Sequence, residues 1–145
     1  MLATHSEIID YIPQRDPFIA VHEILQATDE FAETQFEVLP ESIFVTNGLF
    51  REPGLLENIA QTAAAQMGYI CKKKGVPVPL GYIESIKNLT VFTLPRIGAV
   101  LTTSILVTNN VLSVILLEGI VRLQGAIVCR CEMRIFTGNK AMSFP

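Results

Sequence analysis

The sequence predicts an α+β fold in which a curved antiparallel sheet wraps around one long central helix. The first observation is that 53–71 is the long segment with helical periodicity, in a chain otherwise rich in β-branched residues. The second is a run of strand-like segments after it, separated by Asn and Gly turn signals. The third is the absence of charged residues over 58–71, so we expect this helix to be covered on most sides.

The composition favours one domain that associates with another subunit. The length of 145 residues is typical of a single domain, and we expect one domain over 1–145 with loose ends at 1–5 and 138–145. Half of the residues are hydrophobic and 17% are charged. No apolar run reaches the roughly 18 residues that a membrane span requires. A dimer interface would hide the excess apolar surface.

Charge and cysteine content exclude several other classes of protein. The net charge of −3 and the absence of tryptophan argue against a nucleic-acid partner. The N-terminus lacks the layout of a secretory signal, which favours the cytoplasm. Cys129 and Cys131 are one residue apart, which is not zinc-ligand spacing, and on a strand they would point the same way. We expect buried thiols and no metal or cofactor site.

The segments before the long helix predict a short helix and a hairpin. The short helix is expected over 6–12, because Pro13 cannot continue it. The segments 18–27 and 31–39 are rich in strand-forming residues, and 28–30 has the composition of their connecting turn. We therefore expect these two segments to pair as antiparallel strands.

The long helix has start and stop signals at both ends. An irregular segment over 40–52 with an Asn-Gly turn signal precedes it, and Pro53 suits a first helical turn. Gly75 is a natural C′ residue, and the lysines at 72–74 favour the negative end of the helix dipole. Docking of an acidic carrier protein is the alternative explanation for the lysines.

Four further segments complete the predicted antiparallel sheet. They are expected over 80–92, 100–107, 111–123 and 126–136. Tight turns are expected at Asn109-Asn110 and Gln124-Gly125, because Asn and Gly tolerate positive φ. Short turns of this kind join strands that are antiparallel neighbours in a meander.

Two stripes follow the long helix at helical spacing. One is apolar and contains Leu56, Ile59, Ala60, Ala63, Met67 and Ile70. The other contains Glu57, Gln61, Ala64 and Gly68, so that an acid and an amide lie one turn apart on a face of small residues. We expect Glu57 to be a carboxylate enclosed by the fold.

Two motifs resemble the β-hydroxyacyl-acyl carrier protein dehydratases. IIDYIPQRDPFIAVHEIL, over 8–25, resembles their L-P-H-R-x-P-F-L-L-V-D-R pattern, and LLENIAQTAAA, over 55–65, resembles their helix motif L-x-E-A-M-A-Q. The resemblance implies a hot-dog fold, edge-to-edge dimers and a 3-hydroxyacyl substrate on a phosphopantetheine arm of acyl carrier protein or coenzyme A. It also places Glu57 on the family's helix carboxylate and Gln61 on the glutamine one turn later.

The sequence departs from this family where the chemistry takes place. The family's catalytic histidine lies in an H-F-P-G motif ahead of the helix, but 44–54 reads FVTNGLFREPG, without histidine. Gln14 stands where many members have a histidine in the first motif. In lacking the H-F-P-G motif, the sequence is similar to a divergent branch of dehydratase-like proteins associated with aryl polyene pigments.

The surviving residues can be assigned to parts of a dehydration reaction. Such a reaction requires two proton carriers and donors that hold the thioester oxygen. Glu57 is the candidate catalytic carrier, and the helix-start amides of Gly54, Leu55 and Leu56 are the candidate oxyanion donors. Gln61 and Ala64 complete the expected substrate-binding set, with Ala64 on the pocket floor. No residue is an obvious second carrier.

The remaining polar candidates have simpler explanations. We expect His22 to be packed or solvated rather than catalytic, and we assign no role to His5. Arg51 and Glu52 could line a pocket mouth, although loop charges are more often solvated. Glu57 could itself be a buried structural acid bonded to Gln61.

Three functions remain open from the sequence. The first is a 3-hydroxyacyl-thioester dehydratase of fatty acid or polyene-type lipid synthesis, a hydro-lyase whose missing group comes from another chain or from water. The second is a hot-dog acyl thioesterase that uses Glu57. The third is a non-catalytic acyl-binding subunit of a dehydratase heterodimer. Both a homodimer and a heterodimer with a related hot-dog subunit are compatible with the sequence.

Overall fold

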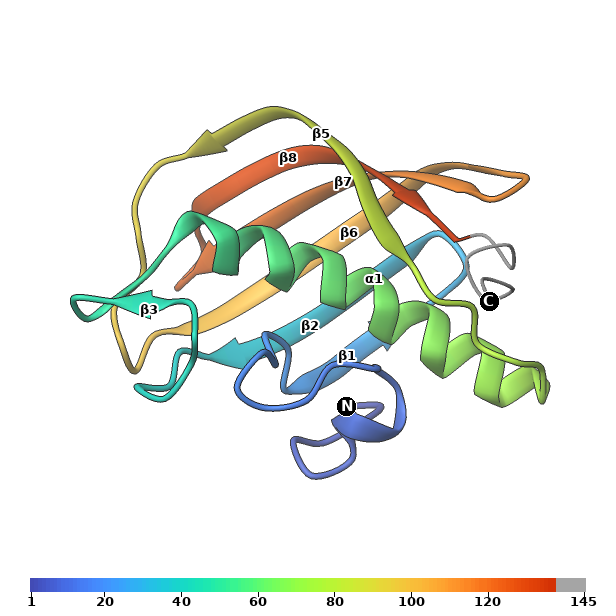
Figure 1. The fold of residues 1–145 in the computed structure, drawn as a ribbon, viewed down its shortest axis with the longest axis horizontal. Helices are drawn as coiled ribbons and strands as arrows, with labels where there is room; N and C mark the ends of the chain where they lie inside the picture. The colour runs from blue at the N-terminus through green and yellow to red at the C-terminus, as the bar shows by residue number, and fades with distance from the viewer. Residues whose placement is uncertain (138–145) are drawn as a thin grey trace, which may run out of the picture.

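One long helix packs against one face of an antiparallel sheet. The computed structural model describes residues 1–137. In it, helix α1 (Glu52–Lys74) lies across six strands in the order β1-β2-β6-β7-β8-β5 (Figure 1). The strands of this sheet are β1 (Glu23–Ala27), β2 (Phe31–Glu37), β5 (Tyr82–Val91), β6 (Val100–Val111), β7 (Val114–Leu123) and β8 (Ala126–Phe136). The predicted α+β arrangement is confirmed.

The start of the chain pairs with β1 and then forms a single helical turn. The predicted helix over 6–12 is reduced to the 3-10 helix η1 (Ile8–Asp10). Ala3, inside the segment expected to be loose, is buried and pairs with Ile24 of β1. Three backbone hydrogen bonds join Leu2 and Ala3 to Ile24. Because Ala3 is also buried, the expectation of a loose start is wrong at this residue. The segment 138–145, also expected to be loose, lies outside the described residues.

Only the second half of the predicted first strand joins the sheet. β1 begins at Glu23, whereas 18–22 forms no strand, although the His22 amide donates to the Gln35 carbonyl of β2 at 2.9 Å. Side chains of α1 bind the backbone at Phe18 and Ala20, which are therefore held by the helix rather than by a neighbouring strand. The turn at 28–30 is confirmed, because the Thr28 hydroxyl accepts a hydrogen bond from the Phe31 amide at 3.1 Å.

The end of α1 has the predicted geometry. Gly75 adopts φ of 68°, and its amide donates to the Lys72 carbonyl at 3.2 Å. The three lysines occupy the last turn, which extends the helix to Lys74. Lys72 and Lys73 lie over tyrosine rings, at 5.5 Å from the Tyr11 centroid and 5.6 Å from the Tyr69 centroid.

The turn between β6 and β7 differs from the prediction. The turn residues are Leu112 and Ser113, with Leu112 at φ of 59°, rather than the two asparagines at 109–110. Apolar positions pair across the hairpin, Val107 with Leu117, and an irregularity follows Val107. With this register, Asn109 and Asn110 pair with Leu116 and Ile115 and belong to the strands rather than to the turn. The predicted turn at Gln124-Gly125 is confirmed by φ of 50° and 83°.

The main core lies between α1 and the sheet. Its fully buried members include Phe36, Leu55, Ile59, Leu101 and Val121. Ile59 sits over Gly119 of β7, where an added Cβ would lie 2.5 Å from its Cγ2 atom. A glycine at this sheet position thus lets the helix approach closely. Among residues 1–137, no helix is long and apolar enough to cross a membrane.

Candidate active site

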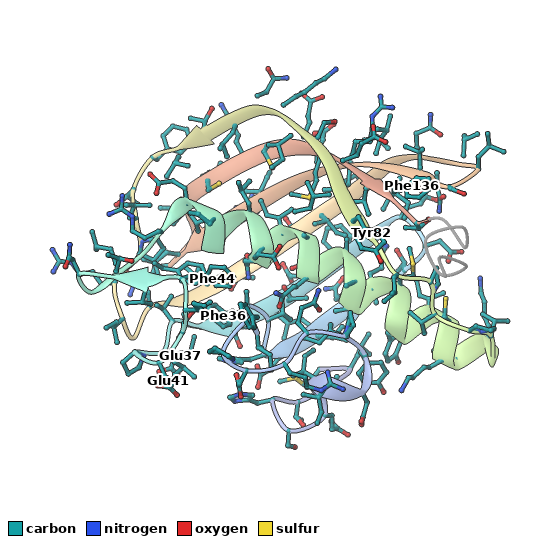
Figure 2. The ribbon with its side chains drawn as sticks, in the orientation of Figure 1. Phe36, Glu37, Glu41, Phe44, Tyr82 and Phe136 are labelled. Atoms are coloured by element: carbon teal, nitrogen blue, oxygen red, sulfur yellow. The ribbon has the colours of Figure 1, made fainter. Side chains whose placement is uncertain are left out.

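A cavity of about 740 Å³ opens beside the helix. Its walls are formed by the N-terminal loop over 9–15, one face of α1, the segment 78–83 where the chain enters β5, and single residues at 115, 135 and 137. Figure 2 marks Tyr82 at the start of β5, next to α1. The helix contributes Glu57, Ala60, Ala63, Ala64 and Met67 to the wall. On this stretch of the helix, small and apolar side chains neighbour a single carboxylate, and Lys72 lines the cavity near the helix end.

Glu57 lies on the cavity wall and is only partly buried. The Gln61 Nε2 atom donates a hydrogen bond to Glu57 Oε1 at 2.9 Å. The prediction that the fold would enclose this carboxylate is wrong, because the cavity leaves one side of it accessible. Ala64, one turn beyond Gln61, also faces the cavity as predicted for the pocket floor.

Gln61 is fully buried and links the helix to the N-terminal loop. Its Oε1 atom accepts from the Ala20 amide at 2.6 Å, and its Nε2 atom also donates to the Phe18 carbonyl at 2.9 Å. Both amide hydrogens are thus engaged, one by Phe18 and one by Glu57. Gln61 does not line the cavity, so its position suits it to orient Glu57 rather than to contact a ligand.

Asn58, the residue after Glu57 in α1, also binds the backbone at Ala20. It was not among the candidate residues from the sequence. Its Nδ2 atom donates to the Ala20 carbonyl at 2.7 Å, and its Oδ1 atom accepts from the Thr103 hydroxyl. Asn58 and Gln61 therefore bind both backbone groups of Ala20. No local pattern identifies Asn58, because its partners lie far away in the sequence.

The start of α1 does not provide the predicted oxyanion donors. The Gly54 and Leu55 amides both donate to the Arg51 carbonyl, at 2.9 and 3.2 Å. Gly54 is also covered, since an added Cβ would lie 2.6 Å from the Phe50 ring and 2.7 Å from Phe44 Cβ. The prediction of unpaired amides at these two positions is wrong. Leu56 packs against the core and does not line the cavity.

A short hairpin explains why the helix start is covered. Strands β3 (Val45–Thr46) and β4 (Leu49–Phe50) pair around Asn47 and Gly48, whose φ values are 54° and 76°. This hairpin places the Phe50 ring 5.4 Å from the Phe36 ring, with Phe44 beside them near the start of α1 (Figure 2). The Asn-Gly turn signal is confirmed, but the aromatic packing could not be read from it.

Arg51 and Glu52, the charged residues at the helix start, are solvated, as expected for loop charges. Arg51 and Glu52 form an ion pair at 3.4 Å, and both side chains are more than 40% exposed. Neither lines the cavity.

His22 is a packed residue and lies away from the cavity. Its Nδ1 atom accepts from the Glu37 amide at 3.2 Å, and its ring lies 4.6 Å from the Phe36 ring. Burial, and secondarily the adjacent His5, lower the pKa of His22 to about 4. Of the two expected states, packed or solvated, the structure shows the packed one. His5 stacks on it at 3.8 Å, a contact for which the sequence carries no signal.

Cys129 and Cys131 are buried free thiols in β8, as predicted. Burial raises the pKa of Cys129 to about 11 and that of Cys131 to about 12. Within residues 1–137, no group of three or more His, Cys, Asp or Glu side chains could hold a metal ion.

Gln14 is a further polar residue on the cavity wall, and the sequence analysis gave it no role. Its Oε1 atom is buried and has no hydrogen-bond partner in the described part of the chain. In the first dehydratase-like motif, Gln14 stands where many members have a histidine.

Comparison with solved structures confirms the hot-dog fold. The dehydratase heterocomplex ApeI:P from Xenorhabdus doucetiae contains a chain with a TM-score of 0.85 and 17% identity, covering 92% of each chain. A hypothetical thioesterase with coenzyme A from Streptococcus pneumoniae has a TM-score of 0.64 and 14% identity, covering 80% of this chain and 84% of that one. The E. coli PaaI protein of a phenylacetic acid degradation operon has a TM-score of 0.60 and 12% identity, with 79% and 81% covered.

Comparison with protein families gives the identity of the chain. No curated protein matches the sequence. The ApeP-like family, described as ApeP dehydratase, matches residues 6–144, which is nearly the whole chain. This match agrees with the dehydratase-like motifs at 8–25 and 55–65. The chain therefore belongs to the ApeP-like family of dehydratases.

Proposed function

We propose that this chain is a cytoplasmic subunit of a dehydratase that removes water from 3-hydroxyacyl thioesters in aryl polyene-type lipid synthesis. In this proposal, Glu57 is one of the two proton carriers. The supporting observation is the Glu57 carboxylate, oriented by Gln61 on the wall of a large cavity lined by small and apolar side chains. Such a cavity suits an acyl chain, and the carboxylate suits proton transfer at its reactive end.

The second proton carrier would come from a partner subunit. Among the described residues, neither histidine lines the cavity. Among residues 1–137, β5 pairs only with β8 and forms one edge of the sheet, and Tyr82 and Ile83 at its start are exposed and border the cavity. A second hot-dog subunit that pairs along β5 would lie next to the cavity and could extend a side chain into it.

The partner would be a related hot-dog subunit rather than a second copy of this chain. The structure with the TM-score of 0.85 is that of a dehydratase heterocomplex, which supports a heterodimer. A homodimer would bring a second Glu57 cavity and second copies of His5 and His22, neither of which lines the cavity within the described residues. The incomplete pair of proton carriers is the physical reason to expect an unequal partner.

The carrier would be a phosphopantetheine arm on acyl carrier protein or coenzyme A. Two exposed basic residues, Arg15 and Lys72, line the cavity along with one exposed acid, Asp10. Basic side chains favour the phosphate groups that both carriers contain. Comparing the two carriers with the same acyl group would show which one the complex prefers.

The test is enoyl-thioester formation by the purified complex, with this chain alone and the partner alone measured in parallel. We expect Glu57→Gln in the complex to lower kcat by about 100-fold or more, because the carboxamide cannot carry a proton. Glu41→Gln is the matched control, since Glu41 is exposed and does not line the cavity. An equal rate in the Glu57→Gln complex would overturn the role of Glu57.

The same experiment separates the two alternative functions. If the complex needs this chain but not its Glu57 carboxylate, the chain is an acyl-binding subunit that completes its partner's site. Thiol release from acyl thioesters would instead indicate a thioesterase. The thioesterase is less favoured because the family that matches residues 6–144 is described as a dehydratase.

A further inference from the structure

Glu57 marks one end of the cavity along α1. It is the first helix residue on the cavity wall, because none of residues 52–56 lines the cavity. The helix start is covered by the Phe44 and Phe50 side chains, which lie against Gly54. An acyl chain whose reactive carbons lie at Glu57 can therefore extend along the cavity only toward the other end of the helix.

The helix wall beyond Glu57 consists of three alanines and then Met67. Ala60, Ala63 and Ala64 leave room beside the helix, whereas Met67 is the one long apolar side chain that α1 contributes to the cavity. Met67 comes ten residues after Glu57, which places it about 15 Å further along the helix axis. Its side chain is partly buried and packs against the main core.

The sheet supplies an apolar floor toward the same end. Ile83 of β5 pairs with Ile135 of β8, which pairs with Ile115 of β7, and all three residues line the cavity. β5 starts soon after the end of α1, and the chain beyond β5 returns to the helix start, where the Phe50 amide donates to the Pro95 carbonyl at 2.8 Å. The start of β5 and this row of isoleucines therefore lie toward the end of α1 (Figure 1).

The segment that joins α1 to β5 covers this end of the cavity. Val78, Pro79 and Leu80 line the cavity and are partly buried. The charged residues on the wall here, Asp10 and Lys72, are exposed. An apolar interior with charges at its rim suits the tail of an acyl chain rather than a phosphate group.

We propose that Met67 sets the length of the acyl chain that the cavity accepts. This inference rests on the proposed dehydratase function. The acyl chain lies along α1 from Glu57, and its methyl end reaches the Met67 side chain. An extended hydrocarbon advances about 1.25 Å for each carbon–carbon bond, so about 15 Å holds about 12 bonds beyond C3. The limit is therefore expected at about 15 carbons in the whole acyl group.

Met67 and the isoleucines have different effects in this arrangement. Ile115 and Ile135 come from the sheet, are only 4% and 5% exposed and belong to the main core, so they form a fixed floor. Met67 comes from the helix that also carries Glu57, so the size of its side chain determines how far the free space extends from the carboxylate. Changes at Met67 should alter the preference for chain length, whereas changes at the floor should alter the fit of all chains.

Kinetics of the purified complex with 3-hydroxyacyl thioesters of increasing chain length test this role. In the wild type, we expect kcat/KM to rise by up to about fourfold per added carbon and to stop rising at about 15 carbons. Met67→Ala should move this limit outward by about three carbons, because it removes three heavy atoms from the end of the cavity. Met67→Leu keeps the approximate volume and should leave the limit within about one carbon.

Two further variants serve as controls. Ile70→Ala is matched to Met67→Ala, because Ile70 is a partly buried residue of α1 that does not line the cavity, and it should leave the limit unchanged. Ile135→Val should change kcat/KM by a similar factor at every chain length. The inference is overturned if Met67→Ala remains active on short chains with an unchanged limit, or if Ile135→Val moves the limit further than Met67→Ala does.

Ligand binding tests the inference without shortening Met67. The probes are two 3-hydroxyacyl pantetheine amides, in which nitrogen replaces the thioester sulfur and blocks turnover, with acyl groups of about 8 and about 15 carbons. The methyl resonances of Ala60 and Met67 are assigned by their absence in Ala60→Gly and Met67→Leu. We expect both probes to shift the Ala60 resonance and only the longer probe to shift that of Met67.

The contrary outcomes distinguish this inference from the proposed function. If both probes shift the Met67 resonance equally, or if both shift Ala60 and neither shifts Met67, the role of Met67 is overturned and the proposed function stands. If neither probe shifts either resonance, the cavity is not the acyl site. In that case the proposed function fails and the role of Met67 fails with it.

Discussion

Gln61 Nε2 lies 2.9 Å from Glu57 Oε1, and the same amide binds the backbone of the N-terminal loop at Phe18 and Ala20. The segment at 18–20, which follows the cavity-lining loop over 9–15, and the Glu57 carboxylate are thus joined through one side chain. A change at Gln61 is expected to affect both the stability of the fold and the orientation of Glu57.

Replacement of Gln61 by leucine should destabilise the protein by about 2 to 4 kcal/mol. Leucine keeps the approximate volume but leaves the buried Ala20 amide and the partly buried Phe18 carbonyl without partners. Urea denaturation gives the free energy of unfolding. Gln66→Leu is the control, because it removes the single hydrogen bond to Thr28 and should cost about 1 kcal/mol. Equal losses in the two variants would contradict a special role for Gln61.

The buried His22 should make the protein less stable as the pH falls. Its pKa is about 4 in the folded chain, against an ordinary value of 6.5, so the unfolded chain binds more protons between these values. Folding stability is therefore fully present above about pH 6.5 and declines as the pH falls toward 4. The contribution is about 1 to 3 kcal/mol.

His22→Phe isolates this contribution from those of the carboxylates. Phenylalanine can retain the stacking on Phe36 but does not titrate. The difference in unfolding free energy between wild type and variant should therefore change across pH 6.5 to 4.5, measured by urea denaturation at each pH. A difference that stays constant over this range would show that His22 does not change its protonation on unfolding.

The three thiols should differ strongly in reactivity. Cys71 is partly exposed, whereas burial raises the pKa of Cys129 to about 11 and of Cys131 to about 12. We expect one thiol per chain to react with a disulfide reagent at pH 8 in the native protein and all three in denaturant. Cys71→Ser should abolish the native reaction. Rapid reaction of a second thiol would place Cys129 or Cys131 at an accessible surface.

Gly68→Ala should destabilise the protein although alanine is the better helix former. The intrinsic preference favours alanine by about 1 kcal/mol. An added Cβ, however, would overlap the Tyr11 carbonyl oxygen, so the N-terminal loop must move away from α1. We expect a net loss of about 1 to 3 kcal/mol in urea denaturation. A gain in stability would mean that the loop does not contact the helix at Gly68.

The same variant links the loop to the site. Because the displaced loop lines the cavity, dehydration by a Gly68→Ala complex should also be slower, even at a temperature where the variant is fully folded. The matched measurement is kcat of this variant against that of Gln26→Leu, at an exposed glutamine of β1 away from the cavity.

Much of the fold follows from patterns within single segments. Helical periodicity predicts α1, and the terminal glycine predicts its end because only a residue tolerant of positive φ fits there. The spacing of Glu57 and Gln61 places them one turn apart, and they do form a hydrogen bond. These features depend on backbone geometry over a few neighbouring residues, which the sequence specifies locally.

The features that the sequence did not predict depend on packing between distant segments. The Asn109-Asn110 pair has turn chemistry, but the register of buried side chains places the turn at Leu112 and Ser113. Helix-start amides are unpaired in general, yet here the Arg51 carbonyl and the Phe44 and Phe50 side chains close the end of α1. Neither outcome is visible in the local composition.

The sequence by itself determined the family, the long helix and the pairing of Glu57 with Gln61, because motifs and helical spacing are local properties. Only the tertiary structure decided which groups face the cavity. It removed the Gly54 and Leu55 amides from consideration and left the Gln14 amide free on the cavity wall. Burial and hydrogen bonding at these positions are set by residues far away in the chain, which is why no local pattern contains them.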